Sequence, residues 1–204
     1  MFKLIRMMKR RPGLTPQQFG DELRRLDAAS PDRVVVSLST GEVALGGEAP
    51  PFDGMAAHYF ATLEGARAAA GGVADAVVCD EHLMAQKPNP AIGLKIIRTV
   101  YRRRDLTHAE FKDYWLKNHS RLEDRVIAES PVQRIIASFA VPEPGRDPAF
   151  DGMVELYFRD VADIRAMFAG PIPAMMRKDE ENFVQMDAPA VRLVALELAS
   201  RGGL

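Results

Sequence analysis

A segment of this chain occurs twice, and the repeat restricts what the chain can fold into. Residues 2–21 reappear at 94–113 with a constant offset of 92 residues, and residues 52–60 reappear at 150–158 with an offset of 98. A repeat of roughly a hundred residues is too long for a solenoid and has the size of a small domain. We therefore expect the function to lie where the two copies differ.

Each copy is predicted to contain the elements β-α-β-β-α-β in the ferredoxin-like order. In the first copy, Thr15 caps a helix that carries Phe19, Leu23 and Leu26 on one face. The other predicted elements of this copy are strands over 2–9, 33–39, 55–60 and 76–85, a loop over 41–51 and a helix over 63–70. The second copy is predicted to have strands over 93–101, 133–141, 153–158 and 190–198, a helix opened by a capping box at 107–110, and helices over 161–169 and 172–183.

The expected domains are residues 1–86 and 93–204, joined by a proline-rich linker at 87–92. A four-stranded sheet with helices on one face leaves its other face uncovered, and two such sheets can bury those faces against each other. The expected fold class is therefore α+β, with two tandem ferredoxin-like units that form an intrachain pseudo-dimeric α/β barrel. The interior of such a barrel is a natural place for a ligand cavity.

The charge balance gives no reason to expect nucleic acid or a membrane as a partner, because the formal net charge is −1. The single cysteine, Cys79, excludes an intrachain disulfide and is expected to be a buried strand thiol. No apolar run is long enough to span a bilayer. We expect a cytoplasmic protein.

The second copy resembles the EthD family of the dimeric α/β-barrel superfamily, and the first copy resembles it more thinly. The residues that carry the resemblance are Lys95-Ile96-Ile97, Arg102-Arg103, Leu106-Thr107, Glu110-Phe111, Tyr114-Trp115 and His119, then Phe150-Asp151-Gly152 and Glu155-Leu156-Tyr157-Phe158. Relatives in this superfamily include lactone isomerases, polyketide cyclases, decarboxylases and cofactor-free monooxygenases, and more distant ones carry haem. The resemblance implies a small, largely apolar substrate and proton chemistry.

The first copy departs from the family pattern. Leu23 stands where the second copy has Trp115, Ala57 stands where it has Glu155, and no histidine matches His119. We expect the first copy to be a degenerate partner that completes the barrel, and the second copy to carry the active site.

His119 is the leading catalytic candidate. A histidine titrates near neutral pH, so it can take up and return a proton. It follows Trp115 by one helical turn on the apolar side of the helix, which favours a buried ring. The alternatives are a core histidine with satisfied hydrogen bonds, or a helix-end histidine stabilised by the dipole.

Arg6 and Arg98 occupy the same place in the first strand of each copy, among apolar residues. A buried guanidinium needs an anionic or hydrogen-bonding partner. A substrate carboxylate or enolate is one candidate partner, which would make both arginines substrate-binding residues. The alternatives are a structural ion pair with Glu155 or Asp113, or a side chain that reaches the sheet edge.

Glu155 and Tyr157 are further catalytic candidates because they share one strand face. A desolvated carboxylate can act as a base, and a tyrosine hydroxyl can donate to an oxyanion. Structural roles are the alternative, and the presence of Tyr59 in the first copy favours packing. Tyr59 and Trp115 are the remaining candidate substrate contacts.

The other histidines do not indicate a metal site. His58, His82 and His108 have no ligand spacing typical of a metal centre, so we expect no metal.

The preferred hypothesis is a cofactor-independent lyase or isomerase that acts by proton transfer on a small aromatic or polyketide-like substrate in the barrel cavity. The alternative is a non-catalytic protein that binds a small apolar ligand. A third hypothesis is a haem protein with His119 as axial ligand. A homodimer of pseudo-dimeric chains remains an open expectation.

Overall fold

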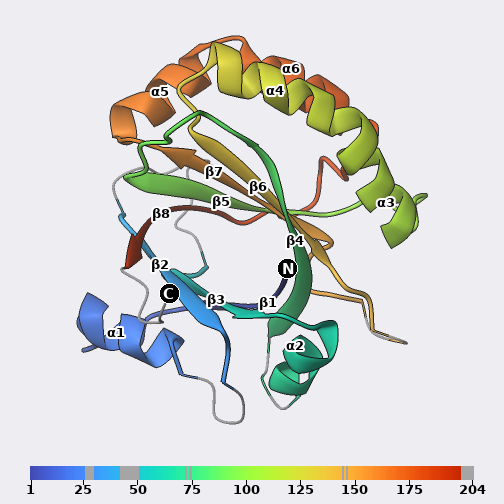
Figure 1. Ribbon diagram of the computed structural model, residues 1–204. Coiled ribbons are helices and arrows are strands. Elements are labelled where there is room, and N and C mark those ends of the chain that lie inside the picture. Colours follow the sequence, from blue (N-terminus) through green and yellow to red (C-terminus); the bar gives the residue numbers. More distant parts are fainter. Residues whose placement is uncertain are drawn as a thin grey trace. The chain divides into compact units, whose positions relative to one another are not determined.

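The computed structural model describes residues 1–25, 30–41, 51–71, 73, 75–143, 145 and 147–198 (Figure 1). Two parts of the sequence predictions lie outside the described residues. They are Leu26 of the first helix and nearly all of the predicted loop over 41–51.

Both copies show the predicted order of elements. The first copy contains β1 (Phe2–Met8), α1 (Pro16–Leu23), β2 (Arg33–Ser39), β3 (Gly54–Phe60), α2 (Leu63–Ala70) and β4 (Ala76–Gln86). The second contains β5 (Leu94–Val100), α3 (His108–Tyr114), the π-helical turn η1 (Trp115–His119), α4 (Ser120–Glu129), β6 (Arg134–Ala140), β7 (Gly152–Phe158), α5 (Val161–Ala169), α6 (Ile172–Glu180) and β8 (Arg192–Leu198). The predicted helix over 172–183 ends earlier, at Glu180.

The eight strands are hydrogen-bonded in the order β1-β3-β2-β8-β5-β7-β6-β4, which makes a mixed α/β fold with a closed antiparallel barrel. The chain packs as two compact units, described separately below. The first unit comprises residues 1–81, 140–149 and 193–204, and the second comprises 82–139 and 150–192. The predicted division into domains 1–86 and 93–204 with a linker stays a prediction.

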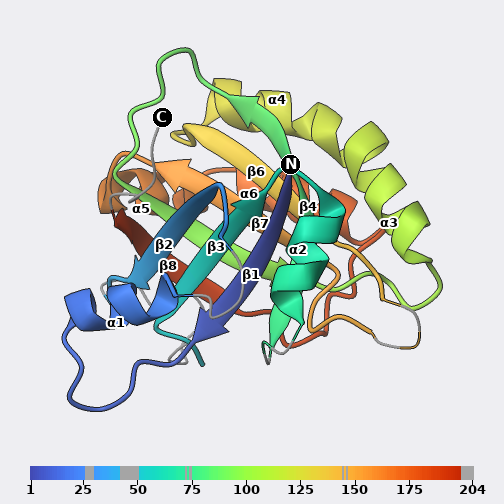
Figure 2. The same cartoon turned by 60° about the horizontal axis from the view of Figure 1, so that its bottom comes forward.

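In the first unit, β1 lies between β3 and β4, and β3 pairs with β2. The helices α1 and α2 lie against this sheet (Figure 2). Leu4 and Phe60 pack on α2, and Phe19 and Leu23 of α1 pack on Val36. Helix α1 begins at the predicted cap, Thr15, with a complete capping box.

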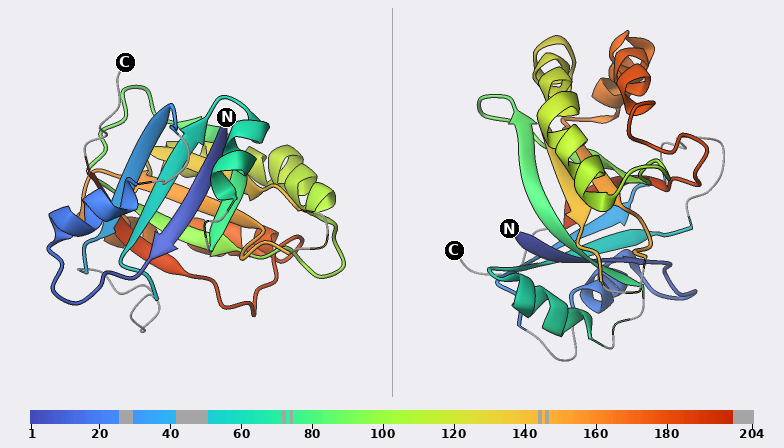
Figure 3. Two further views of the ribbon diagram at one scale, coloured as in Figure 1. Left: turned by 90° about the horizontal axis from the view of Figure 1, so that it is seen from below. Right: turned by 90° about the vertical axis from the view of Figure 1, so that its right-hand side faces the viewer.

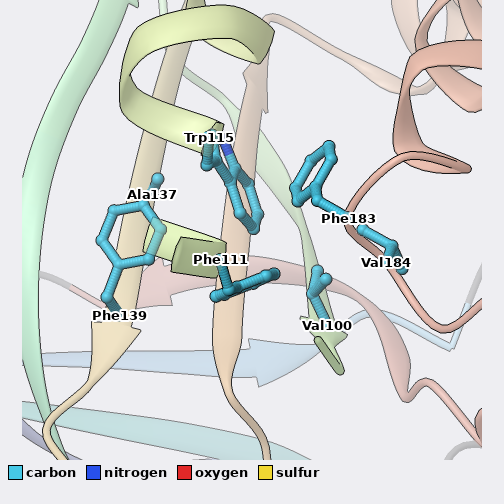
Figure 4. Close-up of a cluster of buried hydrophobic side chains, with 7 residues drawn as sticks. All are labelled: Val100, Phe111, Trp115, Ala137, Phe139, Phe183 and Val184. Atoms are coloured by element: carbon cyan, nitrogen blue, oxygen red, sulfur yellow. The ribbon is translucent and has the colours of Figure 1, made fainter. Parts of the chain in front are cut away.

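In the second unit, β7 lies between β5 and β6, and helices α3 to α6 lie on one side of these strands (Figure 1). The core between the strands and the helices is built from rings and small aliphatic side chains (Figure 4). Its buried members are Val100, Phe111, Trp115, Ala137, Phe139, Phe183 and Val184. A Cβ at position 152 would lie 3.1–3.2 Å from ring atoms of Phe111 and Trp115, so Gly152 lets these rings pack directly on β7.

This core determines which face of the strands meets the helices. Val100 on β5 and Val154 on β7 pack against the helical rings. Because side chains alternate along a strand, Arg98 shares the helix face with Val100, whereas Glu155 and Tyr157 lie on the opposite face.

The helical run of the second copy contains one irregular turn. Helix α3 begins at Thr107 with a capping box, continues through η1 and proceeds as α4, beside α6 (Figure 3). At the end of η1, the Ser120 N–H donates to the carbonyl of Trp115, five residues back. Such π-turns are frequent at functional sites. His119 is the last residue of this turn.

No helix within the described residues is both long enough and apolar enough to cross a bilayer.

Candidate functional site

The π-turn brings His119 to the side chain of Asp179, near the end of α6. The His119 Nδ1 and Asp179 Oδ2 atoms lie 2.7 Å apart, and the Tyr114 hydroxyl donates to the other carboxylate oxygen at 3.1 Å. The imidazole is 3% exposed and packs against Phe183, with ring centroids 4.9 Å apart, and edge-on to Trp115 at 5.8 Å. The predicted buried ring on the apolar helix face is confirmed.

Burial lowers the pKa of His119, and its hydrogen bond to Asp179 opposes that shift only in part. The imidazole is therefore neutral at pH 7, with Nδ1–H donating to the carboxylate. No other hydrogen bond to His119 is present in the described part of the chain. The Nε2 lone pair is left as a proton acceptor, which is the arrangement of a general base held by an aspartate.

Arg98 lies close to this pair but binds another acid. Its two Nη atoms donate to the two carboxylate oxygens of Glu180 at 2.6 and 3.0 Å. The alternative pairings with Glu155 and Asp113 are wrong. Glu155 lies on the other face of the sheet, and Asp113 pairs with Lys117 on the helix surface.

Arg6, the first-copy counterpart of Arg98, has no such carboxylate. Its Nη1 donates to the backbone carbonyl of Arg25 at 2.8 Å, and its Nη2 lies 3.6 Å from the sulfur of Met8. The first-copy arginine therefore stabilises the chain that follows α1, whereas Arg98 holds α6 against β5.

Glu155 and Tyr157 belong to a separate polar cluster, defined with Lys95 as the second-unit triad. Lys95 Nζ lies 2.6 Å from Glu155 Oε2 and 3.4 Å from the Tyr157 hydroxyl, which donates to the same carboxylate at 3.2 Å. Lys95 and Glu155 are each 1% exposed. The five site residues predicted in the second copy thus divide between the two faces of the sheet. Arg98, Trp115 and His119 lie on the helix side, and Glu155 and Tyr157 lie on the other.

The first unit contains a matching cluster, the first-unit triad. Lys3 Nζ lies 2.7 Å from Glu81 Oε2, and the Tyr59 hydroxyl donates to the same oxygen at 2.9 Å. The lysine and tyrosine occupy repeat positions, but the acid comes from β4, because Ala57 stands where the second copy has Glu155. Sequence reasoning missed both lysines. Their signal was a lysine at the same place in two strands whose other charged residue is the arginine three positions later.

Trp115 is a core residue with one polar contact. Its indole N–H donates to Glu123 Oε1 at 3.1 Å. Burial raises the pKa of Glu123 to about 7, and its Oε2 is buried without a hydrogen-bond partner. A substrate contact for Trp115 stays a prediction, as it does for Tyr59.

The remaining histidines lie apart from His119. His58 Nε2 faces the carbonyl of Arg24 at 3.4 Å, and burial lowers the His58 pKa to about 4. His82 packs edge-on against Phe139, and His108 pairs with Asp151. Over the described ranges, no group of three or more His, Cys, Asp or Glu side chains is placed to hold a metal ion.

The fold is shared with solved structures of low sequence identity. An anthrone oxidase-like protein superposes with a TM-score of 0.66 at 8% identity, covering 98% of this chain and 92% of that one. A putative monooxygenase from Fusobacterium nucleatum subsp. nucleatum gives a TM-score of 0.54 at 7% identity, with coverages of 100% and 95%. A putative monooxygenase from Lactobacillus acidophilus NCFM gives 0.51 at 9%, with coverages of 100% and 97%. At such identities the likeness shows the fold alone.

Comparison by sequence gives a more local result. No curated protein matches the chain. The model of the EthD domain matches residues 103–187, a segment that includes both His119 and Asp179. The chain therefore contains a segment similar to the EthD domain, within a fold that it shares with an anthrone oxidase-like protein.

Proposed function

We propose that this protein is an enzyme in which His119 acts as the general base on a small molecule, without a cofactor. The observation that carries the proposal is the 2.7 Å contact between His119 Nδ1 and Asp179 Oδ2 in a buried site. The carboxylate fixes the tautomer in which Nε2 can accept a proton. It also stabilises the imidazolium that forms during the reaction.

Tyr114 supports this arrangement by holding the other carboxylate oxygen of Asp179. With one oxygen bound by the tyrosine, the other stays directed at Nδ1. Tyr114 and Asp179 are therefore positioning residues, and His119 is the residue that takes the proton.

The proposed reaction begins with removal of a proton from an acidic C–H or O–H group of the substrate. In an isomerase the proton returns to another atom of the same molecule, and in a lyase a bond to a leaving group breaks and the leaving group takes the proton. The proposed substrate class, a small aromatic or polyketide-like molecule, is supported by the similarity of residues 103–187 to the EthD domain. Glu155 and Tyr157 take no step in this scheme, because they lie on the opposite face of the sheet and are bound to Lys95.

A second candidate reaction is oxidation of the same kind of substrate. It is favoured by the names of solved structures with this fold, which are an anthrone oxidase-like protein and two putative monooxygenases. The first step would again be deprotonation of a C–H group by His119. The carbanion would form a C–O bond with dioxygen, the oxidant, and the resulting peroxide anion would take the proton back from His119. Loss of water by O–O cleavage would then leave a carbonyl group on the substrate. Uptake of dioxygen during turnover distinguishes this reaction from a lyase or isomerase.

The proposal is tested by proton exchange. The protein is incubated in deuterated buffer with a panel of aromatic ketones, phenols and anthrones, and NMR follows deuterium incorporation. We expect His119→Asn to slow exchange by roughly a hundred- to ten-thousand-fold, with Asp179→Asn also impaired. His108→Gln, on the same helical run, is the control and should exchange normally.

Three results would contradict the proposal. If His119→Asn keeps exchange within a few-fold of the unsubstituted protein, the base lies elsewhere. If no compound exchanges but some raise the melting temperature, the protein is a non-catalytic binder. A Soret band after addition of haemin would contradict the cofactor-free reaction.

We also propose that each copy is a ferredoxin-like unit and that the pair arose by tandem duplication. The proposal is supported by the matching element order and, in the first copy, by the antiparallel strand order β4-β1-β3-β2. A cytoplasmic location and the absence of nucleic-acid and membrane partners stay part of this proposal, as does possible pairing of two chains. Size-exclusion chromatography with light scattering tests the pairing.

A further inference from the structure

The second unit contains a pocket of about 330 Å³ that the proposed reaction does not use. It is lined by residues 98–101 of β5 and the segment that follows it, by Arg177 of α6, and by residues from the segment 184–192. The charged side chains in its lining are Arg98, Arg177 and Arg192, and the lining contains no acid. A concave site with several convergent cationic groups is suited to an anion.

Backbone pairing places two of these arginines side by side. Thr99 N–H donates to the carbonyl of Val191 at 3.0 Å, and Val191 N–H donates to Thr99 Oγ1 at 2.8 Å. In antiparallel pairing this puts Arg98 opposite Arg192, on the same face of the sheet. Like charges in directly opposite positions are destabilising, so this pair costs stability unless an anion lies between them.

The protein supplies only part of the required negative charge. Glu180 is bound by both Nη atoms of Arg98, while Arg98 Nε is buried and has no hydrogen-bond partner among the described residues. Neither the Arg177 nor the Arg192 side chain has a hydrogen bond or ion pair with any described residue. One carboxylate therefore faces three guanidinium groups. Burial, followed by the charges of Arg98 and Arg177, lowers the pKa of Arg192.

A purely structural role accounts for these arginines incompletely. Arg177 lies in the last turn of α6, where a cation stabilises the helix dipole. Arg98 is explained by Glu180. Arg192 lies neither at a helix end nor in an ion pair with a carboxylate of the described residues, although it is partly buried beside the like charge of Arg98.

We propose that this pocket binds the doubly charged oxyanion group of a small molecule, a phosphate monoester or a dicarboxylate, through Arg98, Arg177 and Arg192. Two uncompensated positive charges match a dianion. The planar guanidinium groups of Arg192 and Arg177 offer paired N–H donors to its oxygens, and the Nε of Arg98 offers one more. This site does not depend on the proposed reaction, because binding is measured without turnover.

The test is calorimetric titration of the full chain at low salt with inorganic phosphate, phenyl phosphate and succinate. We expect saturable binding of one anion per chain by the phosphates, by succinate or by both, and the pattern identifies the oxyanion recognised. Arg192→Gln should weaken that binding roughly ten- to a hundredfold, and Arg177→Gln should weaken it less because that residue is exposed. Arg165→Gln, which removes an exposed arginine outside the pocket, is the matched control.

Thermal unfolding separates this role from a structural one. If Arg192 serves the anion, Arg192→Gln keeps or raises the melting temperature of the free protein and loses the rise that phosphate or succinate produces. The proposal is overturned if none of the three anions binds saturably, or if Arg165→Gln weakens binding as much as Arg192→Gln. A lower melting temperature of free Arg192→Gln, with anion binding retained, would also overturn it.

Discussion

The two copies of the repeat share one buried polar cluster and differ in the helix that follows their first strand. Lys3 with Tyr59, and Lys95 with Tyr157, each meet a glutamate. The helix α1 ends at Leu23, whereas its counterpart in the second copy runs on through the π-turn to His119. The polar cluster that both copies share lies on the strands. The longer helix, which only the second copy has, carries the histidine of the proposed proton transfer.

The triads also show that the two copies take their glutamate from different strands. The second copy takes its acid from β7, at Glu155, whereas the first copy has Ala57 there and takes Glu81 from β4. A buried lysine requires a carboxylate, but the carboxylate can come from a neighbouring strand. The two copies therefore neutralise the same lysine position with glutamates on different strands.

The largest expected effect tests whether the triads are structural. Lys95→Met leaves the Glu155 carboxylate buried without its partner, and we expect it to lower the free energy of unfolding by about 3–5 kcal/mol. Lys3→Met should do the same through Glu81. Urea unfolding followed by fluorescence and circular dichroism measures both.

The double substitution Lys95→Met/Glu155→Gln removes both charges and should recover part of the loss. If Lys95→Met keeps full stability but abolishes proton exchange, the second-unit triad is catalytic, and the division of roles between the two faces of the sheet is wrong.

The next effect concerns Glu123 of the second unit. The pKa of Glu123 rises from 4.5 to about 7 on folding. Between pH 4.5 and 7 the folded protein therefore binds more protons than the unfolded chain. The free energy of unfolding falls as the pH rises through this range. Glu123→Gln keeps a hydrogen-bond acceptor for the indole N–H of Trp115 and cannot ionise, so it removes this decrease in stability. We expect stabilisation of up to about 3 kcal/mol at pH 8 and little change at pH 5.

Urea unfolding at both pH values measures the difference. Glu129→Gln, an exposed position on the same helix, should change stability by less than about 1 kcal/mol at either pH. Equal stabilisation by Glu123→Gln at pH 5 and pH 8 would show that Glu123 does not titrate in this window.

The smallest effect on stability at neutral pH comes from His58 in the first unit, and its pH dependence is opposite to that of Glu123. Burial lowers the His58 pKa from 6.5 to about 4. Below pH 6.5 the unfolded chain protonates His58, whereas the folded protein does so only near pH 4. The free energy of unfolding therefore keeps its full value above pH 6.5 and falls by up to about 3 kcal/mol as the pH drops toward 4. His58→Leu should remove this acid-side loss and leave the Glu123 slope intact. An unchanged acid-side slope in His58→Leu would assign the loss to other groups.

Local patterns were enough to predict the elements but not the site. Capping residues, apolar periodicity and the repeat fix where strands and helices begin, and each of these signals spans a few residues. The partners at the site are distant in sequence: His119 meets Asp179 across 60 residues, and Arg98 meets Glu180 across 82. Which face of β5 carries Arg98 toward the helices depends on the packing of Phe111 and Trp115, and strand alternation alone gives no sign of it.

The π-turn between α3 and α4 has a consequence for how such chains are compared. An α-helix advances about 100° per residue, and a turn closed by a five-residue hydrogen bond holds one residue more than its neighbours. A single-residue deletion between Trp115 and His119 would let the run close as a regular α-helix, and the histidine would then fall at a different position relative to Trp115 and Asp179. In this segment, the number of residues in the turn determines where the histidine lies, in addition to which residues are present. An ungapped alignment with a regular helix would place the histidine at the wrong position.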